Sequence, residues 1–164
     1  MEPQPSLGQP DPSSVGRFWQ RFIAATGRNP DLSQPDAWAF GDSVELADEL
    51  IALVLDGTKR ATAGSVAEYE HAGEPLPEVG DLEIVTDGAL RPRAVLQLTD
   101  VLVGPLSSVD ERFAYDEGEG DRTRDYWLAV HTTFFQRVHL ALGIDFTPDM
   151  ATIFQRFDVV YQEP

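Results

Sequence analysis

The chain has 164 residues, a length that suits one domain, and 42% of them are hydrophobic, which is enough for a core. It contains no cysteine, so disulfides, thiolate zinc sites and cysteine nucleophiles are excluded. Its 28 Asp and Glu against 12 Lys and Arg give a formal charge of −16, which disfavours a broad nucleic-acid-binding surface and favours a small ligand.

The first residues predict a tail, and the remainder predicts a single domain. Residues 1–14 contain four prolines and few apolar side chains, so we expect disorder there and a folded domain over residues 15–164. No apolar run approaches the ~20 residues that cross a bilayer, and the N-terminus lacks a basic segment followed by an apolar one. These features predict a cytoplasmic protein with no membrane partner.

Hydrophobic periodicity predicts two helices in the first half of the domain. Apolar side chains recur at helical spacing over residues 15–25, and residues 31–41 are predicted to form a loop. Asp42 then begins a capping box that opens a second helix, which Gly57 ends. Within residues 59–80 we expect two or three short strands and an irregular loop.

Three strands and two further helices are predicted in the second half. The turn signal Asp87-Gly88 between the first two strands indicates antiparallel pairing and therefore an α+β fold. The apolar stripe of the long helix is predicted at Trp127, Val130, Phe134, Val138 and Leu142. In chain order the elements are strands over 81–86 and 93–103, a helix from Ser108 to Tyr115, a helix over 122–142 preceded by the N-cap Asp121, and a strand over 153–161.

A lysine and a threonine three residues apart form the first candidate for chemistry. Lys59 and Thr62 lie in the segment Gly-Thr-Lys-Arg-Ala-Thr at residues 57–62. A threonine hydroxyl is a weak nucleophile until a base takes its proton, and a lysine can be that base when burial or a neighbouring cation such as Arg60 favours its neutral form. The alternative is structural, with Lys59 capping the preceding helix and Thr62 beginning a strand.

An acidic, glycine-rich segment follows downstream. Glu117, Glu119 and Asp121 alternate with glycines, so the loop can approach a ligand closely and turn carboxylates towards it. Such oxygens also suit a hard metal ion, although the spacing is not that of an EF-hand. The alternative is a solvated acidic turn in front of a helix, which the helix dipole favours.

His131 lies one helical turn after Trp127. It can act as an acid or base, or help to form an aromatic floor under a nucleobase. A hydrogen-bonded core histidine is the structural alternative. His71 and His139 have no evident partners in the sequence, so their spacing does not support a three-histidine metal site.

Several of these strings, in this order, resemble the ASCH domain family over about residues 15–162. The resemblance implies a PUA-like fold, which is a small mixed β-barrel with surrounding helices, so that residues 15–164 would be an ASCH domain. The strings are Phe18-Trp19, Phe40-Gly41-Asp42-Ser43, Ala47-Asp48-Glu49-Leu50, Gly57 to Thr62, Glu117-Gly118-Glu119-Gly120-Asp121, Tyr126-Trp127 and His131-Thr132-Thr133-Phe134-Phe135.

The resemblance also implies an activity. Small bacterial ASCH proteins include amidohydrolases that remove the acetyl group from acetylated cytidine nucleosides, without a cofactor, using a lysine, a threonine and a glutamate. The matching positions here are Lys59, Thr62 and Glu117. The residues expected to contact the nucleoside are Arg60, Glu119, Trp127 and His131. The chain departs from the family at Gly64, where many ASCH domains carry an arginine.

Two alternatives remain open within the same family. In a ribonuclease acting on single-stranded RNA, Lys59 would activate the ribose 2′-hydroxyl, and Glu117, Glu119 and Asp121 would hold Mn²⁺ or Mg²⁺. In a non-catalytic reader, the domain would bind RNA or a modified base without turnover. The formal charge of −16 counts against both RNA alternatives.

Overall fold

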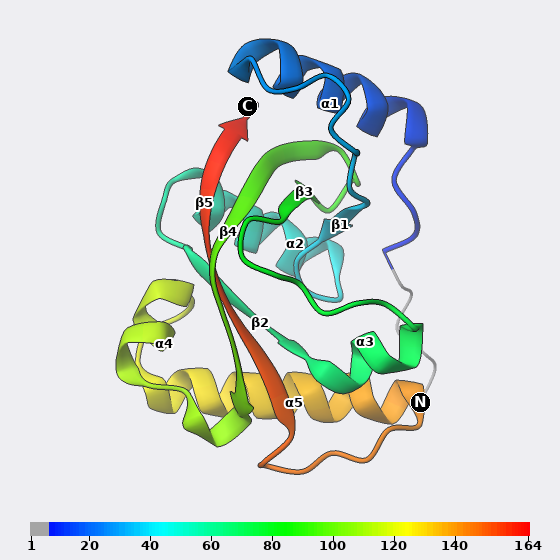
Figure 1. The fold of residues 1–164 in the computed structure, drawn as a ribbon. Coiled ribbons are helices and arrows are strands. Elements are labelled where there is room, and N and C mark those ends of the chain that lie inside the picture. The colour runs from blue at the N-terminus through cyan, green and yellow to red at the C-terminus, as the bar shows by residue number, and fades with distance from the viewer. Residues whose placement is uncertain (1–6) are drawn as a thin grey trace. The chain divides into compact units, whose positions relative to one another are not determined.

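The computed structural model describes residues 7–164, which have an α+β fold with five α-helices and a five-stranded mixed sheet (Figure 1). The strands follow the order β1-β3-β4-β5-β2, with β1 parallel to β3 and the pairs β3–β4 and β2–β5 antiparallel. The helices are α1 (Pro12–Thr26), α2 (Val44–Leu55), α3 (Val66–Ala72), α4 (Glu111–Glu117) and α5 (Arg124–Leu142); the strands are β1 (Ala37–Ala39), β2 (Ala61–Ser65), β3 (Leu82–Thr86), β4 (Pro92–Pro105) and β5 (Ala151–Gln162).

The α+β class predicted from the sequence is confirmed, whereas the predicted barrel is not. Among residues 7–164, β1 and β2 are the two outer strands of the sheet, and no pairing joins them. The sheet is therefore open at these two strands. None of the described helices is long and apolar enough to cross a membrane.

The packing divides the chain into two compact units, each made from segments that are distant in sequence. The first unit comprises residues up to 57 with 81–97 and 158–164, and the second comprises 58–80 and 98–157. Strands β4 and β5 therefore contribute to both.

The first unit has its core between α1 and the sheet. Phe18 and Phe22 of α1 are fully buried and pack with Ile84 of β3 and Val95 of β4. The carboxylate of Asp11 caps α1. The boundary of the predicted tail is corrected, because residues 12–14 belong to this helix; residues 1–6 lie outside the described part of the chain.

Several helix starts also differ from the predicted ones. The N-cap of α2 is Ser43 instead of Asp42, that of α4 is Asp110 instead of Ser108, and that of α5 is Thr123 instead of Asp121. Each observed cap offers a side-chain oxygen to an orphan amide of the first turn. Any of several neighbouring Asp, Ser or Thr residues satisfies that chemistry, so spacing alone does not choose between them.

Two segments that lack strong periodicity were predicted less well. Residues 59–80 contain one strand, β2, followed by the helix α3, instead of two or three strands. The predicted loop at 31–41 contains β1, a three-residue edge strand. The strands predicted over 81–86, 93–103 and 153–161 are confirmed as β3, β4 and β5.

The second unit has its core where α4 and α5 pack on β2 and β5, with α5 lying beneath the lower part of β5 in Figure 1. The buried stripe of α5 differs from the predicted apolar one. It has a strict four-residue spacing, and two of its members are histidines: Trp127, His131, Phe135 and His139. Val130 of the predicted stripe is 37% exposed.

Candidate active site

Lys59 is a buried charge held between two glutamates of the second unit. Its Nζ donates to Glu119 Oε1 at 3.0 Å and lies 3.7 Å from Glu117 Oε1. It also donates to the backbone carbonyl of Glu117 at 3.4 Å. The side chains of Lys59 and Glu117 are each 1% exposed, and that of Glu119 is 17% exposed. Of these three side chains, Glu119 is the most exposed to solvent.

The backbone holds Lys59 against the end of α4. The amide of Arg60 donates to the carbonyl of Asp116 at 2.8 Å. Gly118, which ends α4, has a φ of 74°, and a Cβ there would lie 2.7 Å from the carbonyl oxygen of Thr58. Only glycine permits both this φ and this approach. The glycine next to Glu117 thus lets the segment before β2 come close enough for its lysine to meet the carboxylate.

Glu117 is the most heavily engaged group of the cluster. It is the last residue of α4, and its Oε2 accepts from Trp127 Nε1 and faces His131 Nε2 at 3.0 Å. Burial on its own would raise the pKa of Glu117, but the charges of His131 and Lys59 and the hydrogen bonds from His131 and Trp127 outweigh it, so the pKa is lowered. Glu117 is therefore a buried carboxylate that stays ionised.

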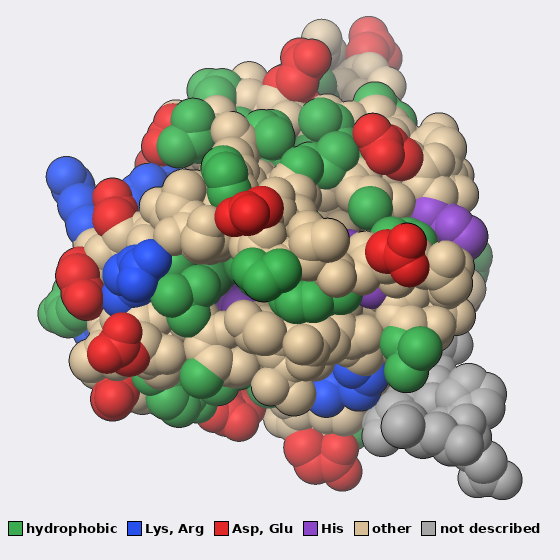
Figure 2. All heavy atoms as spheres, turned by 90° about the horizontal axis from the view of Figure 1, so that it is seen from below, with side chains coloured by type: hydrophobic (Ala, Val, Ile, Leu, Met, Phe, Trp, Pro, Cys, Tyr) green, Lys and Arg blue, Asp and Glu red, His purple; other side chains and the backbone are tan. Residues whose placement is uncertain are grey.

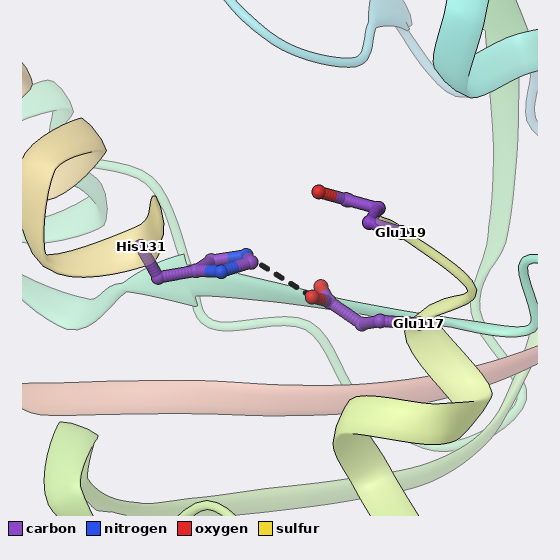
Figure 3. Close-up of side chains that lie close together, drawn as sticks. All are labelled: Glu117, Glu119 and His131. Atoms are coloured by element: carbon purple, nitrogen blue, oxygen red, sulfur yellow. Dashed lines mark ion pairs between the residues drawn. The ribbon is translucent and has the colours of Figure 1, made fainter. Parts of the chain in front are cut away.

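His131 is the second cation of the cluster. Figure 3 shows its ring pointing from α5 towards Glu117, with Glu119 on the segment after α4. Its Nδ1 faces the carbonyl of Trp127 at 2.9 Å, so both ring nitrogens face acceptors, an arrangement that the imidazolium satisfies. Burial lowers the pKa of His131, but the charge and hydrogen bond of Glu117 outweigh burial and raise it above its ordinary value.

Trp127 and His131, both predicted to contact a nucleobase, stack on each other. Their ring centroids lie 3.8 Å apart with planes 11° from parallel. The indole also packs near Phe113 and Phe154, and it is 2% exposed. The tryptophan and histidine rings are therefore part of the core, where they position Glu117.

The same residues provide a test of the predicted metal site. Ligand atoms of Glu117, Glu119 and His131 lie within 4.8 Å of one another, whereas Asp121 is outside this group. The carboxylate of Asp121 instead accepts from the amide and hydroxyl of Thr123. Within the group, the glutamate oxygens already face the N–H donors of Lys59 and His131, so a divalent ion would have to displace them. In the structure these oxygens serve as hydrogen-bond acceptors for N–H groups, an arrangement that suits them better than coordination of a metal ion.

Arg60 lies apart from the ion cluster, in a second pair on the surface. Its guanidinium is 57% exposed and donates to Asp116 Oδ1 at 2.9 Å, and Arg156 of β5 lies 3.3 Å from the other oxygen of Asp116. Sequence reasoning missed Asp116 and Arg156. The signal for Arg156 was a lone cation in an apolar strand, which the pattern does not connect to any partner.

Thr62 lies on a different face of the sheet from the core residues of the second unit. It sits directly across from Gln155 of β5, and the neighbouring residues Ala61 and Phe154 belong to the core under α4 and α5. Because side chains alternate along a strand, Thr62 and Gln155 lie on the opposite face. Within residues 7–164 no hydrogen bond engages the Thr62 hydroxyl, so it is not hydrogen-bonded to the Lys59 amine.

The arrangement can move a proton between a buried amine and solvent. Lys59 Nζ and Glu119 Oε1 are at hydrogen-bonding distance, and Glu119 is the partly exposed member of the cluster. Glu117 cannot take the same part because its oxygens are all directed at buried donors. The geometry thus separates a proton-exchanging carboxylate, Glu119, from a carboxylate that only holds its neighbours, Glu117.

Comparison with known proteins gives one family. The model of the ASCH domain matches residues 36–161. A crystal structure of a DUF984 protein from Enterococcus faecalis V583 is 37% identical, with a TM-score of 0.83 over 90% of this chain and 88% of that one. An ASCH domain from Lactobacillus crispatus JV V101 is 29% identical, with a TM-score of 0.81 over 92% of this chain and 96% of that one. No curated protein matches.

Proposed function

The chain belongs to the ASCH domain family, which is RNA-related, and on this basis we propose that it hydrolyses an amide on a modified nucleoside, with acetylated cytidine as the substrate. The observation that carries the proposal is the buried Lys59, which is hydrogen-bonded to Glu119, the most exposed member of its cluster. Burying charges costs several kcal/mol per ion before pairing repays it, and perturbed buried ionisable groups gather at functional sites. That the fold buries these charges despite the free-energy cost supports a catalytic role for Lys59.

In the proposed reaction, Lys59 is the base and Thr62 the nucleophile. Lys59 first gives a proton to Glu119, which releases it to solvent. Once substrate binding brings the two side chains within reach of each other, the neutral amine takes the hydroxyl proton of Thr62 while Thr62 Oγ attacks the acyl carbon. The C–N bond breaks, and the proton on Lys59 passes to the leaving amine. A water molecule, deprotonated by Lys59, then attacks the acyl carbon of the acyl–Thr62 ester. The C–O bond to Thr62 breaks, Lys59 returns the proton to Thr62 Oγ, and the carboxylic acid leaves with the enzyme restored.

Glu117 has a positioning role in this scheme. Its lowered pKa keeps it ionised, so it does not protonate the leaving amine. It fixes the amine of Lys59 and the ring of His131, and Trp127 fixes Glu117 in turn. Such support matters because catalytic groups lose efficiency when their geometry is displaced by about 1 Å.

The surface charge favours a nucleoside over a polynucleotide. On the face seen in Figure 2, acidic side chains are spread over the surface, whereas Lys and Arg side chains gather at the left edge and at one place near the bottom. With a formal charge of −16, the chain would repel an RNA backbone, whereas a nucleoside carries no phosphate.

A ribonuclease is the second candidate, supported by the group of Glu117, Glu119 and His131, whose ligand atoms lie close enough to share a cation. In that case Mn²⁺ or Mg²⁺ would bind in place of the donors that now face the carboxylates and would offset phosphate charge. A third candidate, a reader of RNA or modified bases, would bind without turnover, and its affinity would fall steeply with salt if phosphates contribute.

One set of incubations separates the three. The purified protein is given acetylated cytidine, with a chelator or with Mn²⁺, and cytidine release is followed by chromatography; parallel samples receive labelled single-stranded RNA. Release that persists in chelator is the expected result. RNA cleavage that needs Mn²⁺, without release of cytidine, would instead identify a ribonuclease. Binding without either product would identify a reader.

A further inference from the structure

Gln155 is a buried polar side chain whose oxygen lacks a hydrogen-bond partner in the described part of the chain. It lies within β5, it is 3% exposed, and its Oε1 accepts no hydrogen bond there. Buried polar atoms are almost always hydrogen-bonded, and an unpaired one costs ~1–3 kcal/mol. Such a cost is recovered if a bound molecule supplies the missing donor.

The residues around Gln155 suit a flat heterocycle. Thr62 lies directly across on β2, on the same face, with its hydroxyl unengaged within residues 7–164. Two residues along β2, Gly64 contributes no side chain to this face. A Cβ at Gly64 would lie 3.6 Å from Cε2 of Tyr69, so the tyrosine ring borders the space that the missing side chain leaves. The face therefore combines an amide, a hydroxyl and an aromatic ring beside a glycine that adds no side chain.

We propose that Gln155 recognises the base of the substrate, an inference that rests on the proposed function. With the Gln155 side chain turned towards the bound substrate, its Oε1 accepts the N–H of the scissile amide, and its Nε2 donates to the adjacent ring nitrogen. An acylated aminopyrimidine presents this donor and acceptor side by side, and a glutamine amide reads such an edge with two hydrogen bonds. Because Thr62 faces Gln155 across the strand pair, the same two bonds bring the acyl carbon to the hydroxyl.

This assignment moves the base to a different part of the second unit from the one that the sequence indicated. The rings of Trp127 and His131 stack on each other, and Trp127 also packs against the core. On the Gln155 face, Tyr69 instead offers a partly exposed ring that lies beside the backbone of Gly64. Stacking of a base on an aromatic ring contributes about 1–3 kcal/mol of binding free energy, whichever base is bound. Discrimination between bases would therefore come from the hydrogen bonds of the Gln155 amide.

Replacing Gln155 by leucine tests the proposal. Gln155→Leu keeps a similar volume and removes an unpaired buried polar group, so the melting temperature should stay constant or rise. The KM for acetylated cytidine should increase about ten-fold or more, whereas the KM for a simple acetylated aryl amine, which has no neighbouring ring nitrogen, should change much less. Gln136→Leu, the same change at an exposed position of α5, is the matched control and should leave both KM values unchanged.

Two results would overturn the proposal. One is an unchanged KM for acetylated cytidine in Gln155→Leu. The other is a lower melting temperature with equal KM changes for both substrates, which would mean that Gln155 is structural. If the wild-type protein releases no cytidine, the proposed function fails, and the binding role is then tested by titrating cytidine into ¹⁵N-labelled protein. The side-chain NH₂ signals of Gln155 should shift; constant signals would refute the role.

Discussion

Replacing Glu117 by glutamine tests whether charge holds the buried cluster together. Glu117→Gln keeps the shape of the side chain and an oxygen for Trp127, but it removes the negative charge that faces Lys59 and His131. The two cations, with side chains 1% and 11% exposed, then remain in a buried site where Glu119 is the carboxylate left in the cluster. Removing one partner of a buried ion pair costs ~3–5 kcal/mol. That is a large part of a total stability of ~5–15 kcal/mol.

Urea unfolding followed by tryptophan fluorescence measures this loss. For a chain of this length, a loss of ~3–5 kcal/mol corresponds to a fall in melting temperature of about 6–20 °C. Glu70→Gln, which removes the same charge from an exposed position on α3, is the matched control and should change the free energy of unfolding by less than about 0.5 kcal/mol. Equal effects of the two substitutions would refute the reasoning.

The pH dependence gives the same test a second readout. The pKa of Glu117 is lowered from its ordinary value of 4.5, so its contribution to stability is present above that pH and is lost as pH falls through the folded-state pKa. The pKa of His131 is raised above 6.5, so its contribution is present below 6.5 and is lost as pH rises through the folded-state pKa. The free energy of unfolding of the wild type should therefore exceed that of Glu117→Gln by the largest amount between about pH 4.5 and 6.5. A difference that does not vary with pH would contradict the charged pair.

Three further predictions concern the surrounding structure. Gly118→Ala should destabilise the protein by ~1–3 kcal/mol more than Gly73→Ala. Both glycines have a positive φ, but of these two only Gly118 has backbone atoms where the new Cβ would lie. Equal melting temperatures of the two variants would contradict this. Ser65→Ala should lower the free energy of unfolding, measured with urea, by ~1–3 kcal/mol. The substitution leaves the buried His139 Nε2 without the hydroxyl that lies 2.7 Å away. An unchanged free energy of unfolding would show that this hydrogen bond does not stabilise the protein. Burial and the charge of Asp81 raise the pKa of Glu83 to about 7, so ionisation costs stability as pH rises from 4.5. Glu83→Gln should then gain stability over the wild type at about pH 8 and not at about pH 4, and the same gain at both would show that the pKa is not raised.

The elements with strong periodicity were predictable from the sequence, and the α5 helix shows the limit of that approach. The range of α5 was predicted to within about two residues. Its buried face was predicted wrongly, because a pattern built from apolar residues alone leaves out His131 and His139. Both are buried because they find partners distant in sequence, Glu117 for His131 and Ser65 for His139. A pattern of local spacing carries no information about such partners.

The candidate site was partly predictable for the same reason. The sequence pointed to Lys59, Glu117 and Glu119 as separate motifs, and the structure brings them together across nearly sixty residues. Their division of roles depends on burial, which the sequence does not state: Glu117 is enclosed and Glu119 is partly exposed. Gln155 was missed because a lone glutamine in an apolar strand becomes informative only when its oxygen is known to lack a partner.

The turnover number of a folded Lys59→Met variant tests the central claim most directly. Methionine fills the space of the aliphatic stem without an amine, and circular dichroism establishes that the variant is folded before the assay. With acetylated cytidine in chelator, the account predicts a fall in kcat of about 10²–10⁴-fold, the usual contribution of one general base. A folded Lys59→Met variant that retains the wild-type kcat would show that the buried lysine is not the catalytic base.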